Sequence, residues 1–116
     1  MKKILVTGAL GQIGTELVMH MREIYGTDNV VASNRRKKDN PIIEAGPFEI
    51  VDVTKPQEIA DAVKKHKVDT IINLAAILSA VGEEKPAAAW DINMNGLYNV
   101  LEVAREHQCA VCTPSS

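Results

Sequence analysis

The chain has 116 residues, enough for one domain with a single core, and its 46% hydrophobic and 24% charged content is typical of a globular protein. A formal charge of −2 excludes a general basic field for nucleic acid, and 3% aromatic residues leave little material for stacking on bases. Glycines interrupt the apolar run near the N-terminus before it could span a bilayer. We therefore expect a cytoplasmic protein that binds neither nucleic acid nor membrane.

The first part of the chain predicts a strand, a glycine loop, a helix and a second strand. An apolar run at 3–6 is typical of a buried strand, and a glycine loop follows from 8 to 14. The next segment has helical periodicity, and we assign its buried face to Ile13, Leu17, Met21 and Ile24. Residues 30–33 predict a second strand, and the polar segment 35–47 predicts a mobile surface loop.

The rest of the chain adds strands at 48–53, 68–74 and 110–113, with two helices between them. Thr54 and Gln57 form a capping-box pattern, which predicts a helix up to about residue 65. We place the buried stripe of that helix at Ile59, Ala62 and Val63. A long helix is predicted at 86–107, and we assign its core stripe to Trp90, Met94, Leu97, Leu101 and Ala104.

This order of elements predicts one α/β domain over residues 1–116. Parallel strands need right-handed helical crossovers, so the natural architecture is a doubly wound, Rossmann-like parallel sheet. We expect five strands in the order 3-2-1-4-5.

Cysteine and histidine residues offer little sign of metal or redox chemistry. Cys109 and Cys112 have a C-x-x-C spacing, but the predicted strand at 110–113 would point them to opposite faces. No second pair is present to complete a zinc site, so we expect no metal. We assign His20, His66 and His107 to solvated helix surfaces.

Three glycines follow the first strand and open the first helix, which is where a phosphate cradle must lie. Gly8 would permit the tight turn, Gly11 would let backbone N–H groups approach a pyrophosphate, and Gly14 would let the helix pack closely on the sheet. A simple turn is the structural alternative. The cofactor-binding residues predicted between these glycines are Leu10, Gln12 and Ile13.

The next diagnostic position ends the second strand, where an acidic residue would bind the adenine ribose. It holds Asn34, and Arg35, Arg36 and two lysines follow. A neutral amide can hydrogen-bond a ribose hydroxyl without repelling a 2′-phosphate, which favours tolerance of NADP beside NAD. A solvated basic loop is the alternative interpretation of these charges.

Three further groups complete the predicted cofactor site. Asp52 and Val53 end the third strand, where a carboxylate can meet the adenine amino group or can serve as a helix N-terminal charge. Asn93 and Asn95 cannot share a helix face, and we choose Asn93 as the inward one. Small residues follow the fourth strand, either beside the expected ribose and nicotinamide or for packing alone, at Leu74, Ala75 and Ala76.

The motifs at 7–14, 52–53, 73–76 and 93–96 together resemble the extended branch of the short-chain dehydrogenase/reductase superfamily. The longer stretches GALGQIGTELV, EAGPFEIVDV, AAILSAVGE and AWDINMNGLYNVLEVA are similar to its short-chain L-threonine 3-dehydrogenases. The likeness covers nearly the whole chain, and it is weakest at 35–41 and 109–112.

The resemblance implies an enzyme that uses NAD to oxidise the 3-hydroxyl of L-threonine, giving 2-amino-3-oxobutanoate. It implies that Ser79 contacts the substrate and that Ser116 takes the catalytic Ser/Thr position, which hydrogen-bonds the reacting hydroxyl. It also implies a homodimer, since extended members pair through a four-helix bundle to which the 86–107 helix would contribute.

The sequence departs from this family at two places. The family normally has Asp where this chain has Asn34, the position of cofactor choice. A Tyr-x-x-x-Lys pair should also follow the catalytic Ser/Thr, with the tyrosine as general base, yet neither Tyr25 nor Tyr98 has a lysine four residues later. The resemblance thus implies that the C-terminal strands and the substrate lobe of such an enzyme are absent from this chain. We therefore expect a fragment of a longer enzyme, inactive alone, rather than a natural half-module.

Two other functions remain open from the sequence. A nucleotide-sugar epimerase or dehydratase shares the glycine loop and the Tyr/Lys pair of the same superfamily. A non-catalytic dinucleotide-binding or redox-sensing module would need no such pair, and its absence favours that alternative. The residues do not settle the substrate independently of the resemblance.

Overall fold

A computed structural model describes residues 2–75 and 86–113, apart from the side chains of Gln12 and of residues 86–93. Its strands are β1 (Ile4–Thr7), β2 (Val30–Asn34), β3 (Phe48–Ile50), β4 (Thr70–Asn73) and β5 (Ala110–Cys112). Its helices are α1 (Gln12–Tyr25), the short 3-10 helix η1 (Thr27–Asn29), α2 (Pro41–Ala45), α3 (Pro56–His66) and α5 (Pro86–His107).

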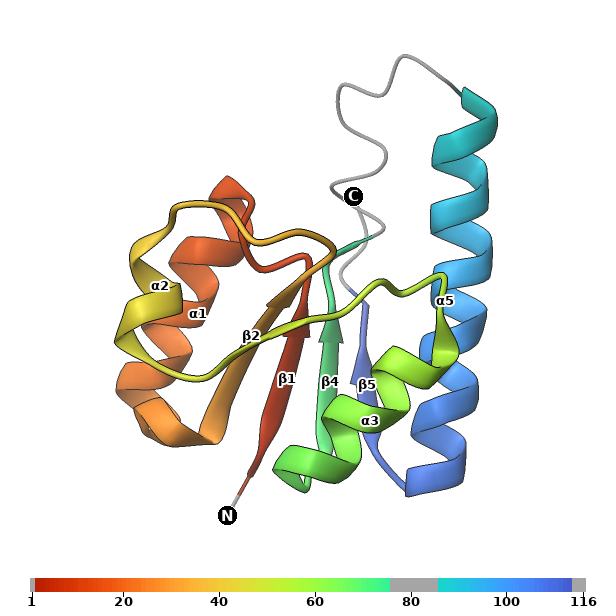
Figure 1. Cartoon of the computed structure of the whole chain (residues 1–116). Helices are drawn as coiled ribbons and strands as arrows, with labels where there is room; N and C mark the ends of the chain where they lie inside the picture. Colours follow the sequence, from red (N-terminus) through yellow and green to blue (C-terminus); the bar gives the residue numbers. More distant parts are fainter. Residues whose placement is uncertain (1, 76–85, 114–116) are drawn as a thin grey trace.

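All five strands pair in parallel and in the order β3-β2-β1-β4-β5, which confirms the predicted strand order (Figure 1). The central strand β1 is in register with both neighbours, so that Ile4 lies opposite Val30 of β2 and Thr70 of β4. The carboxyl ends of β1, β2 and β4 consequently lie along one edge of the sheet, the upper edge in Figure 1.

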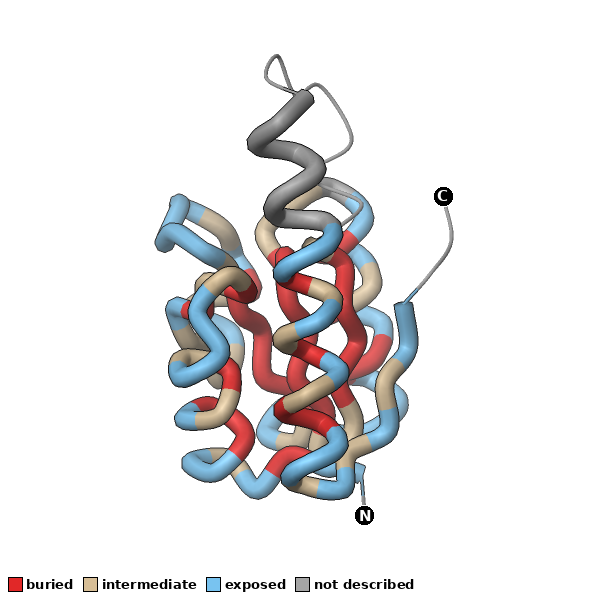
Figure 2. Tube along the Cα trace, turned by 90° about the vertical axis from the view of Figure 1, so that its right-hand side faces the viewer, coloured by how far each residue is buried: buried red, intermediate tan, exposed pale blue. Residues whose placement is uncertain are grey.

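Helices cover both faces of the sheet, α1 and α2 on one side and α3 and α5 on the other (Figures 1 and 2). Because side chains alternate along a strand, Leu5 of β1 packs under α3 and α5, whereas Ile4 and Val6 pack under α1 and α2. A strand buried on both faces must be apolar at every position, which explains the continuous apolar run.

The buried face of α1 differs from the predicted one. Ile13 and Ile24 are each 60% exposed, while Val18 and Met21 are buried against the sheet. Gly14, which packs against the loop below it, shares this face with them at helical spacing. The predicted stripe was therefore wrong at both ends of the helix and right at Met21.

The buried face of α5 also differs from the predicted stripe, although the helix has the predicted bounds. Val100, Val103 and Ala104 face the core, whereas Met94 and Leu101 are about half exposed. Gly96 explains the choice of face, since a Cβ there would lie 2.7 Å from Cγ2 of Val53. The side chain of Trp90 lies outside the described residues.

The segment 35–47 contains the helix α2, where a loop was predicted. The Asn40 side chain caps α2 by accepting a hydrogen bond from the Ile42 N–H at 3.1 Å, and Ile42 itself is buried under the sheet's α1 side. Arg22 of α1 then ties the segment down by donating to the backbone oxygens of Val30, Ile42 and Pro47. Tertiary contacts thus fold a segment whose composition alone indicates a loop.

The predicted capping box of α3 was wrong, although its buried residues Ile59, Ala62 and Val63 are confirmed. The N-cap residue is Lys55, and it makes no side-chain cap. The Thr54 hydroxyl instead donates to Oδ1 of Asp52 at 2.6 Å. At the other end of α3, His66 is mostly buried and lies 2.9 Å from Oε1 of Glu49, so it is not the solvated histidine that was predicted.

Two further observations concern the whole described chain. Cys109 and Cys112 are both free thiols, as their predicted placement on opposite faces of a strand requires. Among the described helices, none combines the length and the apolar composition that crossing a membrane requires.

Candidate dinucleotide-binding site

The glycine loop lies at the carboxyl edge of the sheet, between the ends of β2 and β4. The Ala9 N–H donates to the Ser33 oxygen of β2 at 2.8 Å, and the Leu74 N–H donates to the Thr7 oxygen at 3.2 Å. These two bonds fix the loop against both neighbouring strands. The ends of β1, β2 and β4 are therefore connected by backbone hydrogen bonds at this edge.

Gly8 makes the turn out of β1 with a φ of +64°, a backbone conformation that residues other than glycine rarely adopt. A Cβ at this position would also lie 2.9 Å from the Ala75 nitrogen, so β4 passes directly beside the turn. Gly14 has an equally close contact, because its Cβ would lie 2.8 Å from the Ala9 Cα. Two of the three glycines are therefore required by packing, Gly8 against the chain that leaves β4 and Gly14 against the loop itself.

The first turn of α1 carries backbone donors that no described residue uses. The Thr15 N–H closes the first helical turn on the Gly11 oxygen at 2.9 Å, whereas the N–H groups of Gln12, Ile13 and Gly14 bond to no described residue. Helix N-termini with free N–H groups attract anions, since the donors and the helix dipole act together. The turn can hold a phosphate or pyrophosphate group.

Gly11 has a different role from its two neighbours. It is the N-cap of α1, with an ordinary extended backbone at φ −75° and ψ 173° and no side-chain cap. Its backbone conformation is open to any residue, so the φ and ψ angles do not require glycine there. The absence of a side chain instead leaves the N-terminus of the helix open to a ligand.

Buried polar side chains support the carboxyl edge from below, and they were not among the predicted site residues. The Thr7 hydroxyl donates to Oδ1 of Asn73 at 2.6 Å, and the Ser33 hydroxyl donates to the Val6 oxygen at 2.8 Å. All three polar side chains are buried at the carboxyl ends of β1, β2 and β4. The signal in the sequence is a polar residue at the end of an apolar strand run.

Asn34 lies at the end of β2, half-buried, beside the glycine loop. Its Nδ2 donates to the Arg36 oxygen at 2.9 Å, which turns the chain back after the strand. The side chains of Arg35 and Arg36 are exposed. The structure thus brings the predicted ribose-binding position to the same edge as the glycine loop.

Asp52 follows β3 at this edge, and its Oδ1 accepts hydrogen bonds from both the N–H and the hydroxyl of Thr54. Burial raises the pKa of Asp52, but the Thr54 bonds and the nearby charges of Arg35 and Lys55 outweigh it, so the net pKa lies below its usual value. Asp52 is a stable carboxylate here. The adjacent Val53 has a buried side chain, and its backbone oxygen accepts a hydrogen bond from Nδ2 of Asn99.

The remaining predicted residues divide between the core and the part that the structure does not describe. Leu74 is buried in the core beneath α1, and Ala75 lies against Gly8. Outside the described residues lie Ala76, Ser79, Ser116 and the side chains of Gln12 and Asn93.

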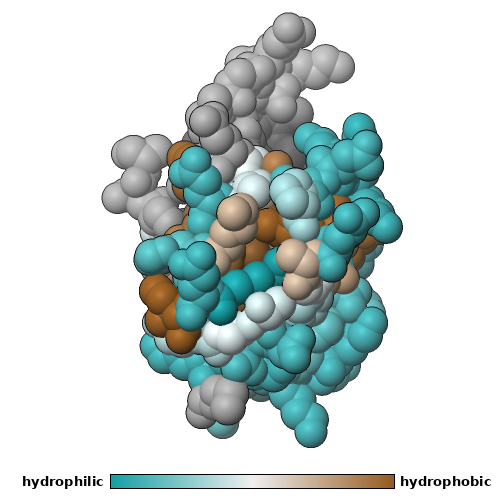
Figure 3. Space-filling model, turned by 90° about the vertical axis from the view of Figure 1, so that its left-hand side faces the viewer, coloured by the Kyte–Doolittle hydropathy of each residue, from teal (hydrophilic) through white to brown (hydrophobic). Residues whose placement is uncertain are grey.

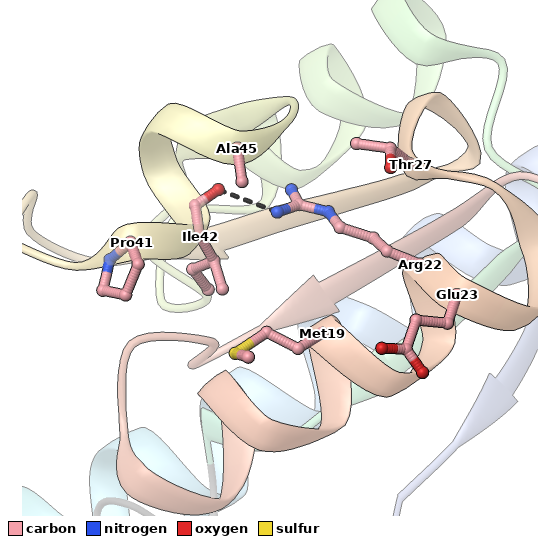
Figure 4. A pocket seen from close by; sticks show the side chains of 7 residues that line it. All are labelled: Met19, Arg22, Glu23, Thr27, Pro41, Ile42 and Ala45. Carbon is pink, nitrogen blue, oxygen red and sulfur yellow. Dashed lines mark hydrogen bonds between the residues drawn. The ribbon is translucent and has the colours of Figure 1, made fainter.

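A cavity of about 310 Å³ opens on a different part of the surface, between α1 and α2 (Figures 3 and 4). Apolar side chains line it, with the Arg22 guanidinium on one wall. Its lining residues are Met19, Arg22, Glu23, Thr27, Pro41, Ile42 and Ala45. None of the predicted cofactor-binding residues is among them.

Comparisons with known proteins agree with this site. The chain matches the NAD dependent epimerase/dehydratase family over residues 4–116. An uncharacterized epimerase/dehydratase of Staphylococcus epidermidis is 53% identical over 117 residues, which span 100% of this chain and 37% of that protein.

Solved structures give the same result. The L-threonine dehydrogenase of Clostridium difficile is 58% identical with a TM-score of 0.93, over 100% of this chain and 37% of that one. The L-threonine dehydrogenase of Phytophthora infestans is 42% identical with a TM-score of 0.87, over 99% of this chain and 36% of that one. The chain therefore spans little more than a third of the length of these relatives.

Proposed function

The chain belongs to the NAD dependent epimerase/dehydratase family, of whose enzymes it forms the NAD-binding part, and we propose that the complete enzyme oxidises L-threonine to 2-amino-3-oxobutanoate. The observation that supports the cofactor site is the first turn of α1, where three N–H groups have no partner among the described residues. The N-cap residue of that turn is Gly11, whose φ and ψ angles do not require glycine. The 58% identity to a threonine dehydrogenase supports the substrate.

The bound NAD would accept the hydride released from the carbon that bears the 3-hydroxyl. The N–H groups of Gln12, Ile13 and Gly14 would hold the pyrophosphate, and Asn34 would accept a hydrogen bond from the adenine ribose. Ser79 would contact the substrate and Ser116 would hydrogen-bond the reacting hydroxyl. No Tyr-x-x-x-Lys pair occurs within the 116 residues, so we expect no turnover from the chain alone.

The cofactor site is tested by calorimetric titration of the chain with NAD. Gly11→Val should abolish binding, because its side chain would fill the space above the helix N-terminus without straining the backbone. Glu16→Val is the matched control, since it adds the same β-branched residue to an exposed position of α1. If Gly11→Val folds and binds NAD as tightly as the unchanged chain, the glycine loop does not hold the pyrophosphate.

The part that this chain would play in threonine oxidation is tested with a chimera in which the chain replaces the aligned part of the Clostridium difficile enzyme, which supplies the remainder of the protein. We expect the chimera to reduce NAD in the presence of L-threonine, because the two sequences are 58% identical over the exchanged part. A chimera that folds and binds NAD but does not oxidise threonine would contradict the proposal.

We also propose that the complete enzyme is a homodimer paired through the outer face of α5. Met94, Tyr98 and Leu101 follow one another at spacings of four and three, and they are 48%, 64% and 48% exposed. Apolar side chains in one stripe of a helix are typical of a helix with a partner on that side. A two-fold interface would bring two copies of this stripe together.

A further inference from the structure

We propose that the adenosine end of the cofactor site accepts a 2′-phosphate, so that the chain binds NADP as well as NAD. This inference rests on the proposed dinucleotide site and concerns its selectivity. The residues that carry it are Asn34 and Arg35 at the end of β2, with Asp52 beside them.

Asn34 presents an acceptor that carries no charge. Its Nδ2 is engaged with the Arg36 oxygen at 2.9 Å, and its own backbone oxygen accepts from the Val51 N–H at 2.9 Å. The side-chain Oδ1 accepts no hydrogen bond from the described residues, so it is the atom left to meet a ribose hydroxyl. A carboxylate here would accept from the ribose more strongly, and it would repel a 2′-phosphate.

Arg35 supplies the positive charge that a phosphate requires. It is exposed, forms no ion pair or hydrogen bond with the described residues through its side chain, and lies close enough to act electrostatically on Asp52. Guanidinium groups bind phosphate through two parallel hydrogen bonds, which makes a free arginine next to the ribose a fitting partner.

Asp52 is the negative charge that could oppose a phosphate at this place, and its surroundings offset it. Its Oδ1 already accepts two hydrogen bonds from Thr54, and Arg35 and Lys55 both favour its charged form. Lys55 also pairs with Glu58 at 3.9 Å, and Oε1 of Glu58 accepts from the Asp52 N–H at 2.9 Å. Arg35 is therefore the cation beside Asn34 that can meet a 2′-phosphate.

The inference is tested by calorimetric titration of the chain with NAD, NADP and adenosine 2′,5′-bisphosphate, the last of which lacks the nicotinamide. We expect NAD and NADP to bind within about tenfold of one another, the scale of one charge-assisted hydrogen bond. Asn34→Asp should shift the ratio at least about tenfold towards NAD, because it adds repulsion and a better ribose acceptor.

Arg35→Ala should weaken NADP and the bisphosphate by about tenfold while leaving NAD within about twofold. Lys64→Ala is the matched control, since it removes one exposed positive charge from α3 and should change no affinity. A chain that binds NAD but neither 2′-phosphate compound overturns this inference and leaves the proposed function intact. A chain that binds none of the three overturns the proposed function itself, and NADP binding unchanged by Arg35→Ala overturns the assignment of Arg35.

Discussion

Arg22 is expected to be the side chain on which the attachment of α2 depends. It is 7% exposed, and it donates to the backbone oxygens of Val30, Ile42 and Pro47 at 3.2, 2.8 and 2.8 Å. No acidic side chain of the described residues pairs with it. Burial lowers the pKa of its guanidinium, and the three carbonyl groups replace the water that burial removes.

The cost of Arg22→Met follows from these contacts. Each hydrogen bond from a charged donor contributes about 1.5–3 kcal/mol, but removal of the charge also returns several kcal/mol of dehydration cost. The Pro47 oxygen keeps a second donor, the Ala32 N–H at 3.0 Å, so it is not left unpaired. The expected loss is therefore about 2–4 kcal/mol out of the roughly 5–15 kcal/mol of a typical domain.

Urea denaturation with linear extrapolation measures this loss, and hydrogen exchange shows whether α2 opens first. Arg22→Lys should lose nearly as much stability, because one ammonium group cannot reach three carbonyl groups in the geometry of a guanidinium. Arg105→Met is the control, since Arg105 is exposed and pairs only with Glu102 on the surface. An Arg22→Met chain that unfolds at the unchanged urea concentration, or full rescue by lysine, would refute the reasoning.

The remaining predictions concern the glycine loop and the acid stability of the fold. Gly8→Ala should destabilise the chain by about 1–3 kcal/mol in the same urea assay, because φ is +64° and the new Cβ would clash with backbone at the end of β4, whereas Gly11→Ala should unfold at the unchanged concentration. Burial raises the pKa of Glu49, but the hydrogen bonds and positive charges of Lys65 and His66 lower it by more, so the net pKa lies below its usual value. Glu49 therefore stabilises the fold above its ordinary pKa, and this contribution is lost as pH falls through the lower folded value. Glu49→Gln should flatten the decline in stability measured between about pH 5 and pH 3, and an unchanged decline would contradict the ion pair's role.

The glycine loop and the strand order could be predicted because their signals are local. Gly8 and Gly14 follow an apolar run directly, and the glycine pattern that predicts their turn spans only seven residues. The parallel order then follows from the chirality of the crossovers. The supporting Thr7 and Asn73 were missed, because their hydrogen bond joins residues 66 positions apart in the sequence.

The helix α2 was missed because a distant residue holds it in place, whereas the N-terminus of α3 was misplaced because of competition between neighbouring residues. The Arg22 side chain donates to the carbonyl oxygen of Ile42, which lies 20 positions later in the sequence. The residues around position 42 give no indication that Arg22 is the donor. Thr54 had a suitable spacing for a capping box, in which its hydroxyl oxygen would accept from a helix N–H. The helix instead begins one residue later, with Lys55 as its N-cap, and the Thr54 hydroxyl donates to Asp52. Competition between local partners of similar strength cannot be resolved from spacing alone.

The error at α5 leads to the clearest test of association. Both sides of this helix carry apolar residues at helical spacing, and the sequence alone favours the side with the larger side chains as the buried one. The structure instead buries the side with Gly96 and Val100, because a larger side chain at position 96 would clash with Val53. The larger side chains then face outward. We expect the chain to self-associate weakly through these outward side chains, as measured by sedimentation across a concentration series. Leu101→Glu should remove that association without lowering stability or NAD affinity, because Leu101 is half exposed. Val100→Glu, one position away in the buried face, should instead unfold the domain. A chain that stays monomeric at high concentration, or a Leu101→Glu variant that associates unchanged, would mean that the outer face of α5 is not the dimer surface.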